Sequence, residues 1–286
     1  MFKNFFERLK VSQAQGTFDA LNELWKRTSL SRRMDMAVEH YWMEKRAASR
    51  NPLIQAGKKY YSQTDEDGIT LEIMRRIGLG TGVFVELGAG DGLENNTLIL
   101  LMSGWKGVWL GSDSMRVTIP PGSARLRYSD AWLTAENCVA HIARELEALP
   151  APGIDFLSID LDGNDYYVAQ EILKSGTRPA VIVVEYNAKF PPPIRWTIKY
   201  DPEHRWMGDD YQGASLQMFA DLFAQADYRL VACNITGVNA YFVRREFDGA
   251  FADVPADTAT LFQAADYNWF VSSGHPPSPK TIERFL

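Results

Sequence analysis

Gly82-Val83-Phe84-Val85-Glu86-Leu87-Gly88-Ala89-Gly90-Asp91-Gly92 is the stretch that decides the fold. It begins as an apolar run of β-branched and aromatic residues, which is typical of a buried parallel strand. The run reaches the acidic Glu86, and glycine then occupies alternate positions, so the backbone can turn tightly and a ligand can approach the main chain. Residues 95–101 predict a helix whose first N–H groups face this turn. Together they predict a nucleotide-type binding edge at the carboxyl end of a sheet.

The spacing of the glycines separates two classes of cofactor. A dinucleotide-binding fold has G-x-G-x-x-G, in which the third glycine packs the helix on the strand. Here the glycines are Gly88, Gly90 and Gly92, which does not match. With Glu86 two residues before the first of them, the stretch resembles the E/D-x-G-x-G-x-G pattern of S-adenosylmethionine (SAM)-dependent methyltransferases. A plain loop is the alternative interpretation.

The composition is that of an ordinary globular protein. The 286 residues can bury a large core, and 46% hydrophobic and 23% charged residues fit one α/β domain with an appendage. No apolar run approaches the roughly 18 residues that span a bilayer, and the first ten residues do not resemble a secretory signal, so no integral membrane segment is expected. Cys138 and Cys233 are the only cysteines, which excludes a disulfide framework and predicts a reducing, cytoplasmic location.

The net charge of −6 is unevenly distributed. Residues 1–60 carry 12 Lys and Arg against 6 Asp and Glu, and the other residues carry 18 against 30. An acidic main domain argues against a nucleic-acid partner. For the basic arm, a solvated helical face is favoured over binding to an anionic surface.

Residues 1–55 are predicted to form a helical N-terminal extension. Phe2, Phe5, Phe6 and Leu9 fall on one helical face, and residues 18–25 and 34–46 repeat the pattern. We expect such an arm to cover the sheet, a substrate pocket or a second copy of the chain, which would make a homo-oligomer through these helices. Binding to a membrane surface is a secondary alternative.

Residues 56–286 are predicted to form the main α/β domain. A Ser/Thr/Asp cluster at residues 62–67 is a capping signal for a helix over residues 69–77. Apolar runs predict parallel strands that alternate with helices, at residues 82–87, 107–111, 124–128, 154–160 and 180–185. Residues 228–233 and 239–244 follow without a helix between them, which predicts an antiparallel hairpin. The predicted fold is therefore a Rossmann-like, mostly parallel seven-stranded sheet that ends in an antiparallel hairpin.

Several motifs occur in one order along residues 60–245. They are Ser62-Gln63, the turn 86–92, Asn96-Thr97, Gly104-Trp105-Lys106-Gly107, Ile159-Asp160-Leu161-Asp162-Gly163-Asn164-Asp165 and Glu185-Tyr186-Asn187. In this order they resemble FkbM-type methyltransferases, a family associated with methylation of sugar and polyketide hydroxyls. The resemblance implies a class I methyltransferase that uses SAM and methylates a hydroxyl of a sugar or another small molecule.

The resemblance also implies a set of cofactor contacts, contributed by the strand ends: Gln63, Glu86, Gly88, Gly90, Asn96, Thr97, Asp113, Ser129 and Asp130. Glu86 and the glycines would border the methionine part, and Asn96 with Thr97 would bind its carboxylate. Gly111 occupies the usual position of the ribose-binding carboxylate, so Asp113 is the substitute. Ser129 and Asp130 would meet the adenine. For each polar residue, helix capping or turn formation is the alternative.

Carboxylates follow two neighbouring strands of the predicted sheet. Asp160 and Asp162 are two residues apart, as are Glu185 and Asn187, so we expect each pair to share a face. Converging carboxylates repel unless a proton or cation intervenes, and oxygen ligands suit Mg²⁺ or Ca²⁺. A metal held by Asp160, Asp162 and Glu185 would orient the acceptor hydroxyl and lower its pKa, which makes Asp160 a catalytic candidate. Alternatively, residues 162–165 form a turn, with Asp165 as the helix cap.

His204 is the candidate general base. His40 and His141 lie in helical patterns and His275 lies in a Pro-rich tail. His204 lies in the long segment 190–213, and loops of this length are usually functional. The segment carries the aromatic residues Trp196, Tyr200, Trp206 and Tyr211, which suit stacking on a sugar but are also explained by loop packing.

Two other functions remain open. A Rossmann-like binding or scaffold protein without turnover is favoured by the glycine at position 111. A nucleotide-sugar-modifying oxidoreductase is opposed by the spacing of the glycines.

Overall fold

The computed structural model describes residues 29–149, 153–267, 270 and 277–286. The chain divides into two compact units, of which the first comprises Met1–Lys45 with Trp269–Val271. The second comprises Arg46–Asn268 and Ser272–Leu286. The apolar helical faces expected before residue 29, and His275, lie outside the described residues.

A long helix, α2 (Ser29–Ala48), accounts for the described N-terminal residues. Within the first unit, the ring of Trp42 on this helix lies 5.1 Å from the ring of Phe270. His40 pairs with Glu44 one turn later at 3.1 Å, with both side chains exposed. The predicted helix over residues 34–46 is therefore present, and His40 serves the helix surface.

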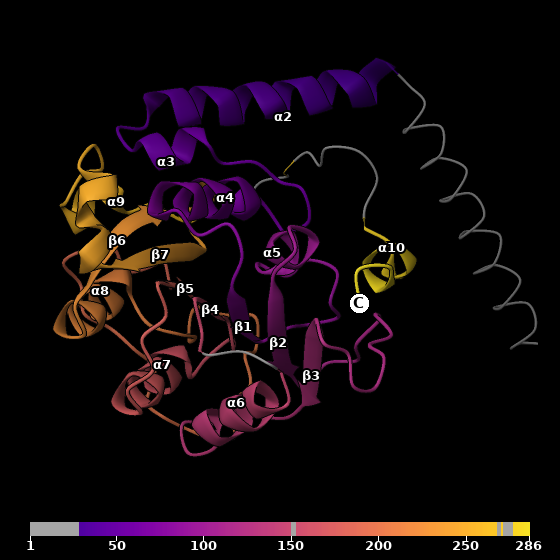
Figure 1. Cartoon of the computed structure of the whole chain (residues 1–286). Coiled ribbons are helices and arrows are strands. Elements are labelled where there is room, and N and C mark those ends of the chain that lie inside the picture. The colour runs from indigo at the N-terminus through magenta and orange to yellow at the C-terminus, as the bar shows by residue number, and fades with distance from the viewer. Residues whose placement is uncertain (1–28, 150–152, 268–269, 271–276) are drawn as a thin grey trace, which may run out of the picture. The chain divides into compact units, whose positions relative to one another are not determined.

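The second unit is built on a seven-stranded sheet in the order β3-β2-β1-β4-β5-β7-β6 (Figure 1). Its strands are β1 (Val83–Leu87), β2 (Lys106–Gly111), β3 (Leu126–Asp130), β4 (Phe156–Ile159), β5 (Val181–Glu185), β6 (Tyr228–Cys233) and β7 (Asn239–Arg244). The first five strands pair in parallel, and β7 is antiparallel to both of its neighbours. This confirms the predicted Rossmann-like fold class.

The central strands are apolar on both faces, as a sheet covered by two helical layers requires. In β1, Phe84 and Val85 are completely buried, and so are Ile182 and Val183 in β5. Because β2 and β4 pair on opposite sides of β1, the direction of chain progression reverses there. In open α/β sheets, ligands bind at the carboxyl ends of the strands beside such a reversal.

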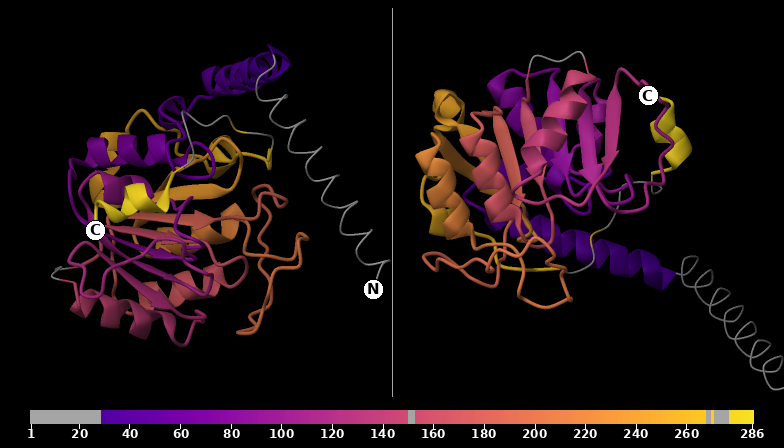
Figure 2. Two further views of the ribbon diagram at one scale, coloured as in Figure 1. Left: turned by 90° about the vertical axis from the view of Figure 1, so that its right-hand side faces the viewer. Right: turned by 90° about the horizontal axis from the view of Figure 1, so that it is seen from below.

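Helices cover both faces of the sheet. They are α3 (Pro52–Gln55), α4 (Glu66–Ile77), α5 (Leu98–Met102), α6 (Cys138–Glu147), α7 (Asp165–Lys174), α8 (Leu216–Gln225), η1 (Arg245–Phe251), α9 (Thr258–Leu261) and α10 (Pro279–Glu283). Figure 1 shows α4 and α5 over one face and α6 and α7 over the other. The connection from β5 to α8 extends outward from the sheet (Figure 2).

The start of the second unit differs from the sequence prediction. Asn51-Pro52 lies in the predicted extension but begins the short helix α3 of this unit, because the Asn51 side chain accepts a hydrogen bond from Leu53 N (3.0 Å). Helix α4 begins at Glu66, and its N-cap residue Asp65 makes no side-chain capping bond. Instead, the buried Asp67 carboxylate accepts hydrogen bonds from the backbone of residues 60–62, which fixes the preceding loop.

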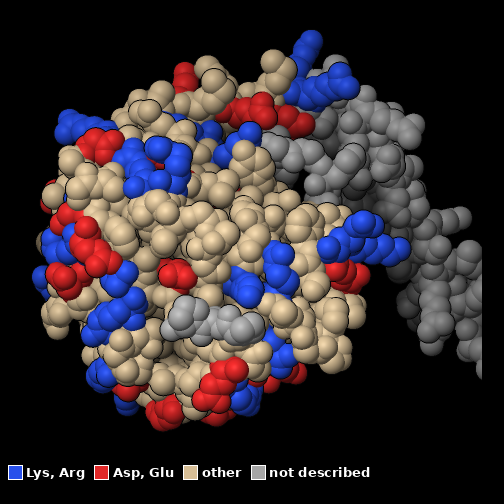
Figure 3. Space-filling view, viewed as in Figure 1, with Lys and Arg blue, Asp and Glu red and all other residues tan. Residues whose placement is uncertain are grey.

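Among the described residues, no helix is long and apolar enough to cross a membrane. Cys138 and Cys233 are both buried and unpaired with each other. On the face shown in Figure 3, Lys and Arg side chains are interspersed with Asp and Glu side chains. This face therefore shows no extended surface of one charge.

Candidate functional site

Two adjoining cavities open at the carboxyl edge of the sheet. The first, of about 610 Å³, lies beside the glycine turn, and its wall includes Gln63, Glu66, Asn96, Arg116, Asp160 and Asn239. The second, of about 600 Å³, is bordered by the ends of β2 to β5, with Asp113, Trp132, Asp162, Glu185, His204 and Trp206 in its wall. Gln63, Gly88, Gly90 and Asp160 line both. The predicted binding edge and the cavities therefore coincide.

The glycine turn is held tightly against its neighbours. Gly88 has φ +86°, and a Cβ atom there would lie 1.6 Å from the carbonyl oxygen of Asp160. Gly90 has φ +51°, but a Cβ atom there would meet no protein atom within 4 Å. Gly88 is therefore required by the fold, whereas the space beside Gly90 is open.

Glu86 is occupied by the protein itself. Its buried carboxylate accepts hydrogen bonds from Asn96 N (2.9 Å), Thr97 N (3.2 Å) and the Thr97 hydroxyl. Burial raises the pKa of the Glu86 carboxyl, and the bonds from Thr97 and Asn96 oppose that rise. The Thr97 hydroxyl also accepts a bond from Trp109 Nε1 (2.9 Å).

This occupation corrects the predicted roles of Asn96 and Thr97. We expected their N–H groups to bind the cofactor carboxylate, but those groups donate to Glu86. The helix that follows, α5, has only five residues and provides no long helix dipole. The Asn96 side chain lines the first cavity and donates to Ser158 Oγ (3.2 Å). Both residues therefore hold the turn, and Thr97 lines neither cavity.

The departure at position 111 has a structural reason. A Cβ atom on Gly111 would lie 3.1 Å from Ala89 N, because both Gly88 N and Ala89 N donate to Leu110 O. The close packing of β2 on the turn leaves little room for a carboxylate side chain there. Asp113 lines the second cavity and is exposed, so a carboxylate remains at this strand end two residues later.

Ser129 and Asp130, predicted to meet the adenine, line neither cavity. The Ser129 hydroxyl faces α6 and accepts a hydrogen bond from Arg144 (2.6 Å). Asp130 is exposed at the end of β3. The residues that reach the second cavity from this strand end are the next three, Ala131, Trp132 and Leu133.

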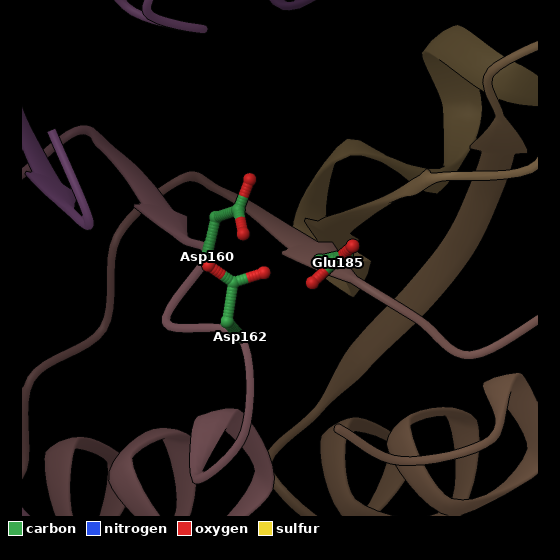
Figure 4. Close-up of side chains that lie close together, drawn as sticks. All are labelled: Asp160, Asp162 and Glu185. Carbon is green, nitrogen blue, oxygen red and sulfur yellow. The ribbon is translucent and has the colours of Figure 1, made fainter. Parts of the chain in front are cut away.

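Asp160, Asp162 and Glu185 converge (Figure 4). One carboxylate oxygen of each lies within 4.8 Å of the others. Glu185 Oε2 is buried without a hydrogen-bond partner among the described residues. Burial, and then the neighbouring carboxylates, raise the pKa values of Asp160 and Glu185 well above their usual range. The site therefore favours a proton or a cation.

The three carboxylates meet for a different reason than strand periodicity. β4 ends at Ile159, and Asp162 lies in a turn with φ +54°. Asn187, which we expected to share a face with Glu185, does not join them. Its side-chain amide donates to Asp210 O and Gln212 O, both at 2.9 Å, and so holds the long connection after β5.

Asp165 is not a cap of α7. It is the first residue of that helix, and its carboxylate accepts hydrogen bonds from Leu161 N (2.7 Å) and Gly163 N (3.0 Å). The N-cap residue Asn164 makes no side-chain capping bond. Asp165 therefore closes the loop that carries Asp160 and Asp162, which together with Glu185 we call the acid cluster. The sequence pattern did not distinguish this role from capping.

His204 reaches the second cavity, as predicted for a residue of the active site. Its ring lies on Gly163, where a Cβ atom would come within 2.3 Å of the ring. His204 Nε2 is buried without a partner among the described residues. The charge of His204 acts on the nearby Asp162 and opposes the rise in its pKa that burial causes.

Of the four aromatic residues predicted to stack on a ligand, only Trp206 lines the cavity. Trp196 stacks on Phe190 at 4.2 Å, and Tyr200 and Tyr211 bond within the loop and its neighbours, as loop packing predicts. Trp132, which was not predicted from the sequence, also lines the cavity, is one third exposed and donates to Pro202 O (2.7 Å). Its position two residues beyond a strand end was the available signal.

Charged residues in the cavity walls are mostly acidic. The first cavity has Glu66, Glu86, Asp91, Glu94 and Asp160 against Arg116, which pairs with Asp91 at 3.3 Å. In the second, four carboxylates face His204 and Arg205, whose guanidinium lies 4.3 Å from the ring centre of Trp132. Such walls attract cations.

No protein-family model matches the chain, and no curated protein matches it. Solved structures that resemble it include the O-methyltransferase TomG from Streptomyces achromogenes, involved in tomaymycin synthesis, in complex with SAM (14% identity, TM-score 0.35, 64% of this chain and 82% of that one). An O-methyltransferase family 2 protein from Planctomyces limnophilus in complex with apigenin has 12% identity and a TM-score of 0.30. An O-methyltransferase family protein from Burkholderia thailandensis has 11% identity and a TM-score of 0.34. These last two matches cover 57% of this chain, which spans about half the length of each protein.

Proposed function

We propose that this chain is a SAM-dependent methyltransferase that acts on a hydroxyl group of a small molecule. The observation that carries the proposal is the glycine turn opening onto cavities with acidic walls. A sulfonium cofactor brings a positive charge to the reacting centre, which these walls favour. A dinucleotide brings a pyrophosphate, which they repel.

The use of the turn's N–H groups supports the same choice. A pyrophosphate is normally bound by free N–H groups at the start of a helix. Here two such groups, on Asn96 and Thr97, already donate to the Glu86 carboxylate. That arrangement weighs against the nucleotide-sugar-modifying oxidoreductase.

The cavities offer room and contacts for SAM, which supplies an electrophilic methyl group when bound. The first has about 610 Å³, within the roughly 300–1,000 Å³ of small-molecule sites. We assign the main chain of Gly88 and Gly90, with Gln63, to the methionine end. We assign the exposed Asp113 to the ribose hydroxyls and the wall around Trp132 to the adenine.

The acceptor hydroxyl would lie beside the acid cluster and His204, on the opposite side of Asp160 from the first cavity. In a reaction of this kind, placing the nucleophile in line with the methyl group supplies most of the rate. The ionised carboxylate of Asp160 or the neutral imidazole of His204 would accept the hydroxyl proton. The exposed face of Trp206 suits a sugar ring, which is the acceptor class that we propose.

We further propose that Asp160, Asp162 and Glu185 hold Mg²⁺ or Ca²⁺. The fit rests on the unpartnered, buried Glu185 Oε2 and on three carboxylate oxygens within 4.8 Å. Hard divalent cations bind such oxygen ligands, and a bound cation lowers the pKa of a neighbouring hydroxyl. Oligomerisation through the N-terminal helices and a cytosolic location stay predictions.

Titration calorimetry with SAM and with NADP⁺ tests the cofactor. Gly90→Val should abolish SAM binding, because the side chain would fill the open space beside the turn. Gly176→Val is the matched control, since Gly176 has φ +88°, equally open surroundings and a position outside both cavities. Unchanged SAM affinity in a folded Gly90→Val protein, or NADP⁺ binding in its place, contradicts the assignment.

Chelation tests the metal separately. EDTA should reduce methyl transfer and leave SAM affinity unchanged, and added Mg²⁺ or Ca²⁺ should raise the Tm through mass action. Asp160→Asn should remove this thermal shift. Full turnover in excess EDTA with no shift would leave the methyltransferase but not its metal. SAM binding without transfer to any of a panel of sugars and phenols would instead favour the scaffold protein.

A further inference from the structure

The loop between β4 and α7 is fixed by one buried carboxylate. Asp165 is completely buried, with Oδ1 accepting from Leu161 N at 2.7 Å and Oδ2 accepting from Gly163 N at 3.0 Å. These two N–H groups flank Asp162 on either side. Both chain neighbours of Asp162, a member of the acid cluster, are therefore hydrogen-bonded to the Asp165 side chain.

That tie explains the conformation of Asp162. Its φ of +54° is left-handed, a conformation that is unfavourable for a residue with a Cβ atom. The two hydrogen bonds that its neighbours donate to the Asp165 carboxylate offset this cost. In the resulting turn the Asp162 carboxylate lies with those of Asp160 and Glu185 (Figure 4).

The same loop supports the segment that carries His204. The imidazole ring lies directly on Gly163, and Asn164 Nδ2 donates to Asp201 O at 2.7 Å. Gly163 is itself bonded to Asp165 through its N–H group. A change in the position of Asp165 would therefore shift both Asp162 and His204 in the wall of the second cavity.

We propose that Asp165 is a positioning residue for the acceptor half of the site, holding Asp162 in the acid cluster and Gly163 beneath His204. Asp165 lines neither cavity, so it acts through these two neighbours and not on a ligand. The proposal deepens the proposed function and rests on it. Burial also raises the pKa of Asp165 to about 6. With this pKa, Asp165 is mostly ionised at neutral pH, and a buried charge lowers the stability of the protein. Such a loss of stability is expected at a residue kept for its position in a functional site.

The chain contains a matched control. Asp67 is equally buried, lies in the first turn of α4 and accepts hydrogen bonds from the backbone of residues 60–62 at 2.5–2.9 Å. Its loop leads to Gln63 and has no part in the acid cluster. Burial raises its pKa to about 6 as well. The two aspartates thus share burial and accept from the backbone of a preceding loop, Asp67 through Oδ2 alone and Asp165 through both oxygens, and they differ in the loop they hold.

Hydrogen–deuterium exchange of the full-length protein tests the positioning role without any ligand. In Asp165→Asn and Asp165→Ala we expect faster exchange in two segments together, residues 160–164 and 199–206. The strands β4 and β5 should stay as protected as in the wild type. Asp67→Asn should loosen residues 60–63 only. Faster exchange confined to 160–164, or spread over the whole unit, overturns the proposal.

Mn²⁺ binding, followed by electron paramagnetic resonance in place of Mg²⁺, tests the consequence for the acid cluster. Asp165→Ala should weaken Mn²⁺ binding at least tenfold, and Asp165→Asn should weaken it less, because the asparagine oxygen can keep one of the two bonds. SAM affinity should stay within twofold of wild type in both, and Asp67→Asn should leave Mn²⁺ affinity unchanged.

The outcomes separate the proposals. Wild-type Mn²⁺ affinity in a destabilised Asp165→Ala protein would make Asp165 a purely structural residue. A wild-type protein that binds SAM but not Mn²⁺ would remove the metal proposal and leave the exchange result to decide the role of Asp165. A wild-type protein that binds no SAM would remove the methyltransferase proposal itself.

Discussion

Glu86 and Glu185 are carboxylates at similar positions in the sheet, but the described part of the chain provides hydrogen-bond donors for Glu86 and leaves one oxygen of Glu185 without any. Each lies near the carboxyl end of a parallel strand, with β4 between the two strands. Glu86 accepts hydrogen bonds from Asn96 and Thr97. Glu185 Oε2 has no partner among the described residues. The protein therefore uses the Glu86 carboxylate as a hydrogen-bond acceptor, and its described residues leave one oxygen of Glu185 without a donor.

The difference shows how a carboxylate that the protein itself uses can be told from one with an oxygen left free. Burial raises the pKa of both carboxyls, but hydrogen bonds oppose the rise at Glu86, whereas the charges of Asp160, Asp165 and Asp162 add to it at Glu185. Buried polar atoms are nearly always paired in folded proteins. An oxygen at a cavity wall that no described residue pairs with, such as Glu185 Oε2, is therefore free to accept a bond from a ligand.

The largest effect on stability should come from removing the Glu86 carboxylate. In Glu86→Ala, two backbone N–H groups and one hydroxyl lose their charged acceptor inside the protein. We expect the free energy of unfolding to fall by about 3–5 kcal/mol, the range for one-sided loss of a buried charged partner. Urea unfolding followed by tryptophan fluorescence measures this, and Trp109, bonded to Thr97, reports on the region directly. A loss below about 1 kcal/mol would contradict the structural role of Glu86.

The fold was predictable from sequence because its signals are local. The apolar runs of β1, β4 and β5 and the short connection between β6 and β7 each specify an element within a few residues. The meeting of Asp160 with Glu185 was also predictable, since carboxyl ends of adjacent parallel strands share one edge.

The use of each polar group was not predictable. Whether the Thr97 N–H faces a cofactor or Glu86 depends on the path of a ten-residue loop, which no periodicity describes. Asp165 illustrates the same limit, because a cap and a loop-closing acceptor have the same residue type at the same helix start. Trp132 reaches the cavity through a bend after β3 that the pattern of that strand does not contain.

The second prediction concerns pH. Burial raises the pKa of Asp165 and Asp67 to about 6 and that of Asp65 to about 7, all from 3.8. A raised pKa in the folded protein means that stability is highest while the group is protonated and is lost as pH rises through the folded value. At about 1.4 kcal/mol per pKa unit, we expect unfolding free energy in EDTA to fall by at least 2 kcal/mol between pH 5 and pH 8.

Mg²⁺ sharpens this result. A bound cation replaces the proton on the Asp160 and Glu185 pair, so the fall toward pH 8 should be smaller with Mg²⁺ than with EDTA. Urea titrations at pH 5, 6.5 and 8 under both conditions give the comparison. A stability that rises with pH would contradict the raised pKa values, and an identical slope in both solutions would show that Mg²⁺ does not replace protons held by Asp160 and Glu185.

The third prediction compares the effects of isosteric changes at Glu185 and at Glu86. Glu185→Gln replaces a carboxyl whose ionisation is opposed by burial and by the neighbouring carboxylates, so we expect the free energy of unfolding in EDTA to rise by about 1 kcal/mol, as often found when a residue kept for function is replaced. Glu86→Gln should change stability in the opposite direction, since an amide cannot accept all the bonds made to the carboxylate. Thermal unfolding of both proteins measures the signs. Equal signs would remove the distinction between the two sides.

The smallest effect on stability is expected at Asp113, an exposed carboxylate in the wall of the second cavity. Asp113→Ala should change the free energy of unfolding by less than about 0.5 kcal/mol, as for most surface substitutions. If its carboxylate accepts the ribose hydroxyls, loss of one or two partly solvated hydrogen bonds should weaken SAM binding by about 1 kcal/mol, or roughly fivefold.

Asp130→Ala is the control, because Asp130 was an equally plausible contact from sequence but lines neither cavity. Calorimetry should therefore separate two exposed aspartates on neighbouring strand ends. If both variants bind SAM as the wild type does, the ribose is held by the main chain alone. The lost carboxylate at position 111 then has no substitute in the chain.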